Sequence, residues 1–359
     1  MTYLKFLNEN FGEQEVEEDP VYINTSKRKT QGNIGVVDDE DPKYKNHMQF
    51  LKNTLETSQL KVFLRAYLAS KNSKSMELER TLQNLFRRFW NNKYTYEEFN
   101  VVLNKKKLPL KKTNTMGIDK ITKHAQPFFD QRFFDDLFSV TAGKKGTSVG
   151  DGEIILWFLF ANLLNPTGKG GGDITTTNGQ GFEIKKAFGS TGFRFVSQIQ
   201  PVKWDQLEKE LIDLGDIYKL KLPLLAAART KSFTRDKFSE LRQELVNNKN
   251  DELYRKVITL FHPYRQFSDN DMGKKLNIFK SAINGSETFE EFLVACQFYS
   301  YANLEKFAAI GFWMSRESLT IIGGNDLESF EGVHGVVQKY LKAHALWDNS
   351  RGPGQVRTK

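Results

Sequence analysis

Asp173, Glu183 and Lys185 are the residues of this sequence whose types and spacing best suit chemistry on a substrate. Two neighbouring carboxylates repel one another unless a cation lies between them, and carboxylate oxygens are ligands that hard divalent ions prefer. A lysine beside such an ion would bind a phosphate or orient an attacking water. These parts together suit metal-assisted hydrolysis of a phosphodiester, in which the ion acidifies a bound water and stabilises charge at phosphorus.

The residues around these three predict a β-hairpin that would hold them. A threonine-rich strand is expected over residues 173–177, an Asn-Gly pair then marks a tight reversal, and a second strand is expected over residues 182–188. Glu183 and Lys185 are two positions apart, so they share one face of the second strand, and the residues between them point the other way into a core.

The loop of the hairpin decides which face Asp173 occupies. A three-residue loop would pair Thr177 with Gly181 and Asp173 with Lys185. Glu183 would then be the diagonal neighbour of Asp173, at roughly 7–8 Å between backbones, and both carboxylates could reach one ion. A two-residue loop would turn Asp173 to the opposite face. The two registers therefore make opposite predictions for the site.

The chain before the hairpin is expected to be a helix and a glycine-rich connection. Residues 150–165 are largely apolar and precede Pro166, which lacks a backbone donor and ends a helix. A glycine run over residues 168–172 then releases the chain into the hairpin. This arrangement leaves little room for a strand between the helix and Asp173.

The order of these residues resembles the PD-(D/E)xK nuclease superfamily, which includes type II restriction enzymes and mismatch-repair nicking enzymes. The superfamily has an Asp at the start of one strand and Glu-x-Lys on the next. The motif here consists of Gly172-Asp173 and then Glu183-Ile184-Lys185, with glycine where the motif has proline. The likeness covers residues 145–200 and a later return of the core, which is less than half of the chain.

The resemblance implies a role for each matching residue. Asp173, Glu183 and the carbonyl of Ile184 would be metal ligands, and Lys185 would assist the attacking water. Glu153 matches a glutamate that members often carry on the preceding helix, where it would bind the metal or a water on it. The ion would be Mg²⁺, with Mn²⁺ as an alternative.

The fold class expected from this resemblance is α+β with an α/β core, in which a restriction-endonuclease-like mixed sheet is flanked by helices, with large helical additions. The superfamily usually has a strand between the first helix and the strand of Asp173. The later helix and strand of the core would follow a helical insertion at about residues 202–300, and residues 288–302 and 306–314 are the segments that fit them.

The expected organisation has four parts. Residues 1–45 form a flexible charged tail, residues 46–112 a helical region, residues 113–325 the nuclease core, and residues 326–359 a C-terminal helix and polar tail. The acidic patches of the first part are expected to be solvated. An alternative is that they occupy the DNA groove until DNA displaces them.

The charge balance favours a polyanionic partner. The formal net charge is +8 and the isoelectric point about 9.2, which favours contacts with phosphates through counterion release. Double-stranded DNA is the partner expected. The basic residues that flank the hairpin or crowd one loop are the candidate phosphate contacts, namely Lys169, Lys186, Arg194, Lys105, Lys106, Lys107, Lys111 and Lys112.

Other chemistries find little support. Cys296 is the one cysteine and lies in an apolar helical pattern, so it is expected to be buried core in a reducing compartment. The five histidines are scattered, which argues against zinc. No apolar run approaches the roughly 20 residues that span a bilayer, and the N-terminus lacks the pattern of a secretory signal. We therefore expect no membrane partner and a cytoplasmic protein of a bacterium or phage-infected cell.

The sequence thus predicts a hydrolase of phosphodiester bonds, a Mg²⁺-dependent deoxyribonuclease that cuts DNA internally. Restriction enzymes often dimerise to cut both strands, so a homodimer is one arrangement that the resemblance allows. Two alternatives stay open. One is a non-catalytic DNA-binding or virion-associated structural protein with a nuclease-like hairpin, and the other is a nuclease directed at RNA.

Overall fold

A computed structural model describes residues 115–121, 172–176, 178–190, 192–226 and 235–359, together with residues 152, 153, 156, 160, 163 and 164. The expected tail over residues 1–45, the helical region over residues 46–112, Lys169 and the five lysines between positions 105 and 112 lie outside the described residues.

The described elements have the following bounds: β1 (Met116–Ile118), β2 (Leu163–Leu164), β3 (Ile174–Thr176), β4 (Gly181–Lys186), α8 (Trp204–Tyr218), α9 (Pro223–Ala226), α10 (Arg235–Asn248), α11 (Asp251–Leu260), η2 (Arg265–Phe267), α12 (Met272–Ala282), α13 (Ser286–Glu305), β5 (Ala309–Trp313), β6 (Leu319–Gly323), α14 (Gly324–Leu327), α15 (Phe330–Tyr340), β7 (Leu341–Ala343), β8 (Trp347–Asp348), β9 (Gly352–Pro353) and β10 (Val356–Thr358).

The chain forms two compact units, which are taken separately here. The first comprises residues 1–109, 120–169 and 173–180, and the second comprises residues 110–119, 170–172 and 181–359. In the first unit β2 and β3 pair in antiparallel fashion. In the second unit the strand order is β1-β6-β5-β4, with β4 parallel to β5 and the other neighbours antiparallel. The protein is therefore α+β with a mixed sheet.

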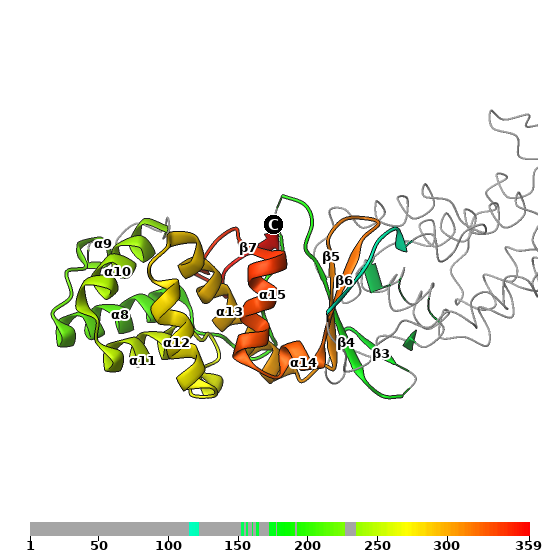
Figure 1. Ribbon diagram of the computed structural model, residues 1–359, viewed down its shortest axis with the longest axis horizontal. Coiled ribbons are helices and arrows are strands. Elements are labelled where there is room, and N and C mark those ends of the chain that lie inside the picture. The colour runs from blue at the N-terminus through cyan, green and yellow to red at the C-terminus, as the bar shows by residue number, and fades with distance from the viewer. Residues whose placement is uncertain are drawn as a thin grey trace, which may run out of the picture. The chain divides into compact units, whose positions relative to one another are not determined.

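The parallel pairing of β4 with β5 requires a long connection, since parallel neighbours cannot be joined by a tight turn. Helices α8 to α13 form that connection. Figure 1 shows α8 to α12 gathered at one end of the second unit and β4 to β6 at the other, with α13 and α15 between them. Helices therefore occupy most of the described part of residues 202–300, where helices were expected, and α13 is followed by strand β5 as expected.

Helix α13 forms the centre of this unit. Every residue from Glu291 to Ala302 is buried, including Cys296, so the helix is covered on all sides as its apolar sequence requires. Phe292 contacts Phe279 of α12 and Phe330 of α15, with ring centroids 5.0 and 5.3 Å apart. Phe298 on the same helix contacts Phe312 of β5 at 5.7 Å. One helix thus joins the helical layer to the sheet.

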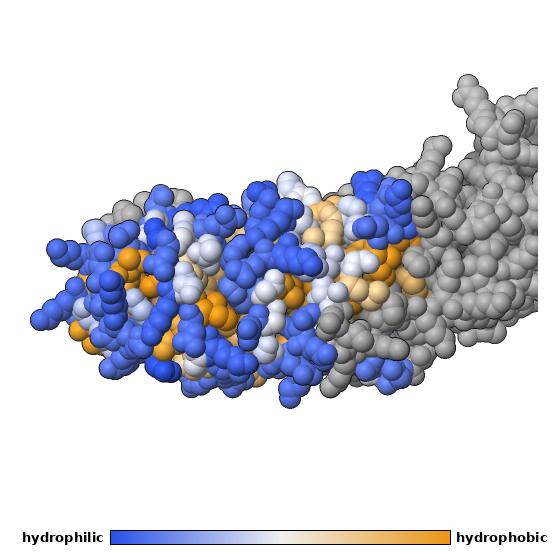
Figure 2. Space-filling view, in the orientation of Figure 1, coloured by the Kyte–Doolittle hydropathy of each residue, from blue (hydrophilic) through white to orange (hydrophobic). Residues whose placement is uncertain are grey.

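The surface agrees with this arrangement. On the face shown in Figure 2, hydrophilic side chains cover most of the helices and hydrophobic ones form small separate patches. Large hydrophobic residues that are well exposed in the described part of the chain are few, with Ile217 at 69% and Ile199 at 51%. No helix among the described residues is long and apolar enough to cross a membrane.

Two sequence predictions about element boundaries were wrong. The helix expected over residues 150–165 does not reach its expected end, because Leu163 and Leu164 form β2 and pair with β3. A strand therefore does precede the segment of Asp173, where the sequence had left little room for one. The buried Leu163 explains the change, since an apolar pair can be satisfied by a sheet as well as by a helix.

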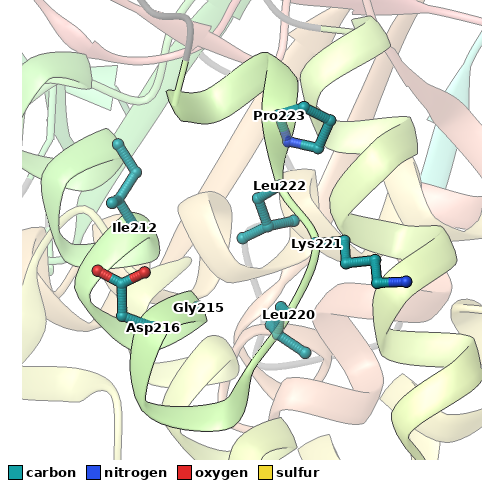
Figure 3. A pocket seen from close by; sticks show the side chains of 7 residues that line it. All are labelled: Ile212, Gly215, Asp216, Leu220, Lys221, Leu222 and Pro223. Atoms are coloured by element: carbon teal, nitrogen blue, oxygen red, sulfur yellow. The ribbon is translucent and has the colours of Figure 1, made fainter.

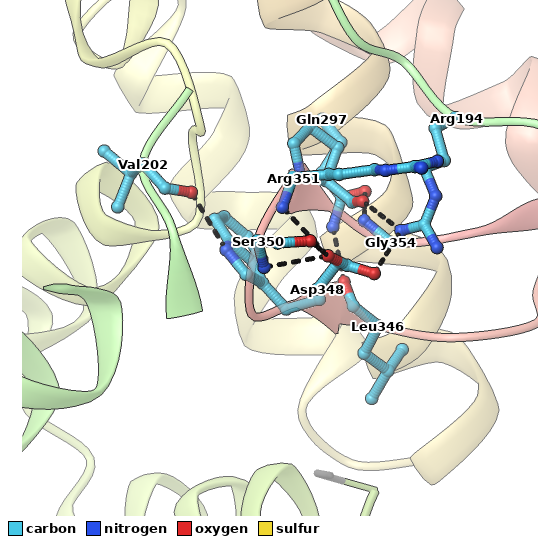
Figure 4. Close-up of polar contacts among 10 residues, drawn as sticks. Arg194, Val202, Gln297, Leu346, Asp348, Ser350, Arg351 and Gly354 are labelled. Atoms are coloured by element: carbon cyan, nitrogen blue, oxygen red, sulfur yellow. Dashed lines mark hydrogen bonds and ion pairs between the residues drawn. The ribbon is translucent and has the colours of Figure 1, made fainter. Parts of the chain in front are cut away.

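The polar C-terminal tail expected after residue 347 is also wrong, because the chain continues into β8, β9 and β10. Figure 4 shows how this segment is attached. The buried Gln297 side chain of α13 donates to the Leu346 carbonyl at 2.7 Å and accepts from the Gly354 amide at 3.0 Å. Trp347 Nε1 donates to the Val202 carbonyl at 3.1 Å. These side-chain bonds hold residues 346–354 in place, where a polar tail was expected.

A buried polar cluster lies between α12, α13 and α15. Lys275 is fully buried, donates to the Ser268 carbonyl at 2.9 Å and lies over the Tyr299 ring at 4.8 Å from its centroid. Burial lowers the pKa of Lys275 to about 8. Burial, and after it the charges of Lys275 and Arg265, hold the pKa of His262 well below 6.5. Both groups therefore release protons on folding.

We predict that the free energy of unfolding falls as the pH drops below the ordinary histidine pKa of 6.5, because the unfolded state then takes up a proton that buried His262 resists. Lys275 acts in the same direction, because its pKa is about 8 in the folded protein and 10.5 in the unfolded chain. The free energy of unfolding should therefore rise as the pH increases from about 8 to 10.5. Urea denaturation across the acid range measures the first effect. His262→Gln should weaken the dependence of the free energy of unfolding on pH below 6.5. His344→Gln, at a half-exposed position, is the control. An unchanged slope in His262→Gln would contradict the prediction.

A second prediction concerns Gly311 of β5. A Cβ there would lie 2.8 Å from Phe182 Cζ of β4 and 3.1 Å from Leu319 Cδ1 of β6. Gly311→Ala should therefore cost about 1–3 kcal/mol through overpacking. Gly335 in α15 has open space around its Cβ position, so Gly335→Ala should stabilise by about 0.5–1 kcal/mol. Thermal unfolding of both variants tests this contrast, and equal effects would refute it.

Candidate functional site

The candidate site is built on one face of β4. Glu183 and Lys185 extend from the same side of the strand, and Lys185 Nζ forms an ion pair with Glu183 Oε1. The side chain of Glu183 is 6% exposed and that of Lys185 is 19% exposed. A carboxylate at this depth needs a positive partner, and Lys185 supplies one. The prediction that these two residues share a face is confirmed.

The opposite face of β4 is apolar. Phe182 is fully buried and its ring end occupies the space above Gly311 of β5, while Ile184 is 7% exposed. The register pairs Glu183 with Ile310 and Lys185 with Phe312. Residues paired across strands share a face, so the polar pair lies beside the apolar wall of β5. The side-chain alternation expected from the sequence is therefore confirmed within β4.

Tyr301 of α13 completes the polar group. Its phenol donates to Glu183 Oε1 at 2.6 Å, and Lys185 Nζ lies 5.4 Å from the centroid of its ring. Tyr301 and Lys185 thus bind the same oxygen of Glu183. The two donors fix the orientation of the carboxylate.

The sequence did not reveal the role of Tyr301. It lies 118 positions from Glu183, within a helix whose sequence predicts only a buried structural role. A tyrosine among phenylalanines on a buried helix is a weak signal, because a buried phenol usually has a polar partner. Its partner is set by the packing of α13 on β4, which spacing along the chain does not disclose.

Aromatic side chains, called the aromatic wall here, pack beside Tyr301. Phe195 stacks on Phe298 at a centroid distance of 4.5 Å and lies 5.7 Å from Tyr301. Tyr264 accepts from the Ser197 amide at 2.7 Å. Burial is the main cause that raises the pKa of Tyr264, and the nearby positive charge of Lys185 opposes it. These rings lower the local dielectric, which strengthens the interactions of the polar group.

Asp173 and Glu153 belong to the first unit. Asp173 directly precedes β3 and is half-buried, and Glu153 is 8% exposed. The turn after β3 differs from the expected register. The amide of Thr176 donates to the Gln180 carbonyl at 2.8 Å, so the reversal closes one residue before the expected pair of Thr177 with Gly181. The Thr176 hydroxyl causes this shift, because it accepts from the Gln180 amide at 2.9 Å.

The oxygen atoms at β4 supply only some of the ligands that a hard cation such as Mg²⁺ needs. Among the described residues, no three His, Cys, Asp or Glu side chains are gathered so that they could hold a metal ion. Glu183 Oε2 is one oxygen of the kind that Mg²⁺ prefers. Full coordination would need further oxygen ligands from other segments, from the main chain and from water.

Of the basic residues predicted to contact DNA, Lys186 and Arg194 lie in the described part of the chain. Lys186 is exposed at the end of β4, and its Nζ lies 4.8 Å from the Phe188 ring. Arg194 forms an ion pair with Asp348 at 3.0 Å and donates to the Pro353 carbonyl at 3.1 Å, as Figure 4 shows. A phosphate at Arg194 would have to compete with Asp348, whereas Lys186 projects into solvent.

A pocket of about 390 Å³ lies on a different part of the unit, beside α8 and α9, and its lining consists of Ile212, Gly215, Asp216, Leu220, Lys221, Leu222 and Pro223. Figure 3 shows its two charged side chains, Asp216 and Lys221, pointing away from one another. The lining is otherwise apolar, so the pocket offers no group of residues for catalysis. The polar group on β4 remains the candidate site.

Comparison with known proteins does not identify the chain, since no family model, curated protein or solved structure matches it. The site therefore has to be judged from its own geometry.

We predict strong energetic coupling between Glu183 and Lys185. Lys185→Met should destabilise the protein because it leaves a buried carboxylate without its cation. The double variant with Glu183→Gln should recover part of that loss, with a coupling energy on the order of 1–3 kcal/mol. Denaturant unfolding of the four proteins in the cycle measures it. The exposed Lys280–Asp251 pair at 2.7 Å is the control and should couple far more weakly. Additive effects at Glu183 and Lys185 would contradict the prediction.

Proposed function

We propose that this protein is a Mg²⁺-dependent DNA endonuclease related to the PD-(D/E)xK nucleases. The observation that carries the proposal is the buried group of Glu183, Lys185 and Tyr301, in which two donors orient a carboxylate on the strand of the Glu-x-Lys motif. The order of elements supports it as well, since α13 leads into β5 and β5 pairs in parallel with the strand of the Glu-x-Lys motif.

Asp173 is the second carboxylate that the proposal requires. The turn pairs Thr176 with Gln180, which shifts the register expected from the sequence by an even number of positions. An even shift leaves each residue on its expected face of its own strand. Under the proposal, Asp173, Glu183 and the Ile184 carbonyl hold the ion, and Glu153 binds it directly or through water.

The residues of the chain then have separate tasks. When bound, Mg²⁺ supplies a more acidic water and stabilises negative charge at phosphorus. Tyr301 and the backbone of β4 hold Glu183 in one orientation, so little conformational entropy is lost when the carboxylate binds the ion. Lys185 donates from Nζ to the attacking water or to the scissile phosphate. Burial of the Glu183 side chain, which is 6% exposed, strengthens these contacts.

We predict that the purified chain converts supercoiled plasmid to nicked or linear DNA when Mg²⁺ is added, and that EDTA abolishes the reaction. Asp173→Ala, Glu183→Gln and Lys185→Ala should each reduce the rate about a hundredfold or more. The matched controls are Asp205→Asn and Lys209→Ala at exposed positions of α8, which make the same kinds of change far from β4. Tyr301→Phe should give a smaller loss, since it removes one bond that orients Glu183.

The rival functions give different results in the same assay. Background nicking that is equal in the native protein and all variants would refute the proposal and favour a non-catalytic DNA-binding protein. Single-stranded RNA run in parallel distinguishes the second rival, because faster loss of RNA than of plasmid would identify an RNA-directed nuclease. Gel filtration of the native chain with DNA tests whether the chain forms the homodimer that the resemblance allows.

A further inference from the structure

The two-stranded pairing of β7 with β10 has one buried and one charged face. The register pairs Val356 with Ala343 and Arg357 with Lys342. Leu341, Ala343 and Val356 are buried in the core, so their neighbours in each strand point outward. Lys342 and Arg357 therefore lie directly opposite one another on the outer face, both partly exposed.

This pair of like charges is unusual because it is not neutralised. Cross-strand residues lie about 4.5–5.5 Å apart at Cβ, and like charges there are destabilising. Neither Lys342 nor Arg357 has an acidic partner among the described residues, and Arg357 Nε is buried without a hydrogen-bond partner there. Other cations on this side of the unit are paired, namely Arg194 with Asp348, Lys359 with Glu291 and Arg235 with Glu290.

The pair lies close to the strand of the candidate site. The Thr358 amide, next to Arg357, donates to the Ala187 carbonyl at 3.1 Å. Ala187 directly follows Lys186 at the end of β4. Figure 1 shows β7 beside the C-terminus of the chain. Arg357 is thus one residue away from a backbone bond to the end of β4, where Lys186 is exposed.

We infer that Lys342 and Arg357 form a phosphate-binding site that grips the DNA backbone next to the site on β4. The choice of DNA as the ligand rests on the proposed function, whereas the choice of an anion rests on two facing cations that have no acidic partner in the described part of the chain. Arginine suits a phosphate because its guanidinium group can donate charge-assisted hydrogen bonds to phosphate oxygens. A phosphate between the two cations would also remove their mutual repulsion.

The test measures binding of a short fluorescent DNA duplex by anisotropy, in EDTA, so that cleavage does not enter. For the native chain the logarithm of affinity should fall linearly with the logarithm of salt concentration. The Lys342→Gln/Arg357→Gln double variant should lose about tenfold or more in affinity at low salt, and its slope should be shallower by about two. Lys342→Arg/Arg357→Lys keeps both charges and should retain most of the slope.

Lys203→Gln/Lys209→Gln removes two exposed charges, one directly before α8 and one within it, and serves as the matched control. A double variant at Lys342 and Arg357 that keeps the native affinity and slope would overturn the inference, as would a native chain that does not bind DNA. Thermal unfolding first verifies that the variant folds. If it does not, Lys342→Gln alone replaces it, with a slope shallower by about one expected and an unchanged slope overturning the inference. Binding that depends on this pair, together with an absence of plasmid cleavage, would leave this site intact and reject the nuclease.

Discussion

The alternation of side chains along β4 is the constraint on which the candidate site depends. A strand has only two faces, and burial of Phe182 and Ile184 on one of them forces Glu183 and Lys185 onto the other. That second face is covered by α13, so the two charges are withdrawn from water together. Their mutual attraction and the phenol of Tyr301 offset this cost. A one-residue slip of the strand would exchange the two faces and destroy both the core and the ion pair.

Much of this arrangement could be predicted from the sequence, because it follows from local patterns. The alternation of β4, the helices after Trp204 and the strand that returns beside β4 each follow from periodicity and turn chemistry. Features that depend on tertiary contacts could not. Thr176 moved the turn by one residue through its hydroxyl, and Tyr301 meets Glu183 only because α13 packs on the sheet.

The C-terminal strands show the same limit of sequence patterns. Residues after Trp347 are polar and rich in glycine, so they resemble a tail. Val356 is nevertheless fully buried, and Phe193 pairs with it through reciprocal backbone bonds of 2.8 Å. A single apolar residue in a polar segment gives almost no periodic signal. The segment is ordered by what it meets in space, which includes the buried side chain of Gln297.

The long connection between β4 and β5 has a consequence for biosynthesis. Parallel neighbours separated by all of α8 to α13 can pair only after a large loop closes, and such distant contacts form late in folding. During translation, β4 leaves the ribosome well before the helix and strand that cover its polar face. The nascent chain thus carries Glu183 and Lys185 for some time without Tyr301, and the carboxylate acquires its fixed orientation only when synthesis is nearly complete.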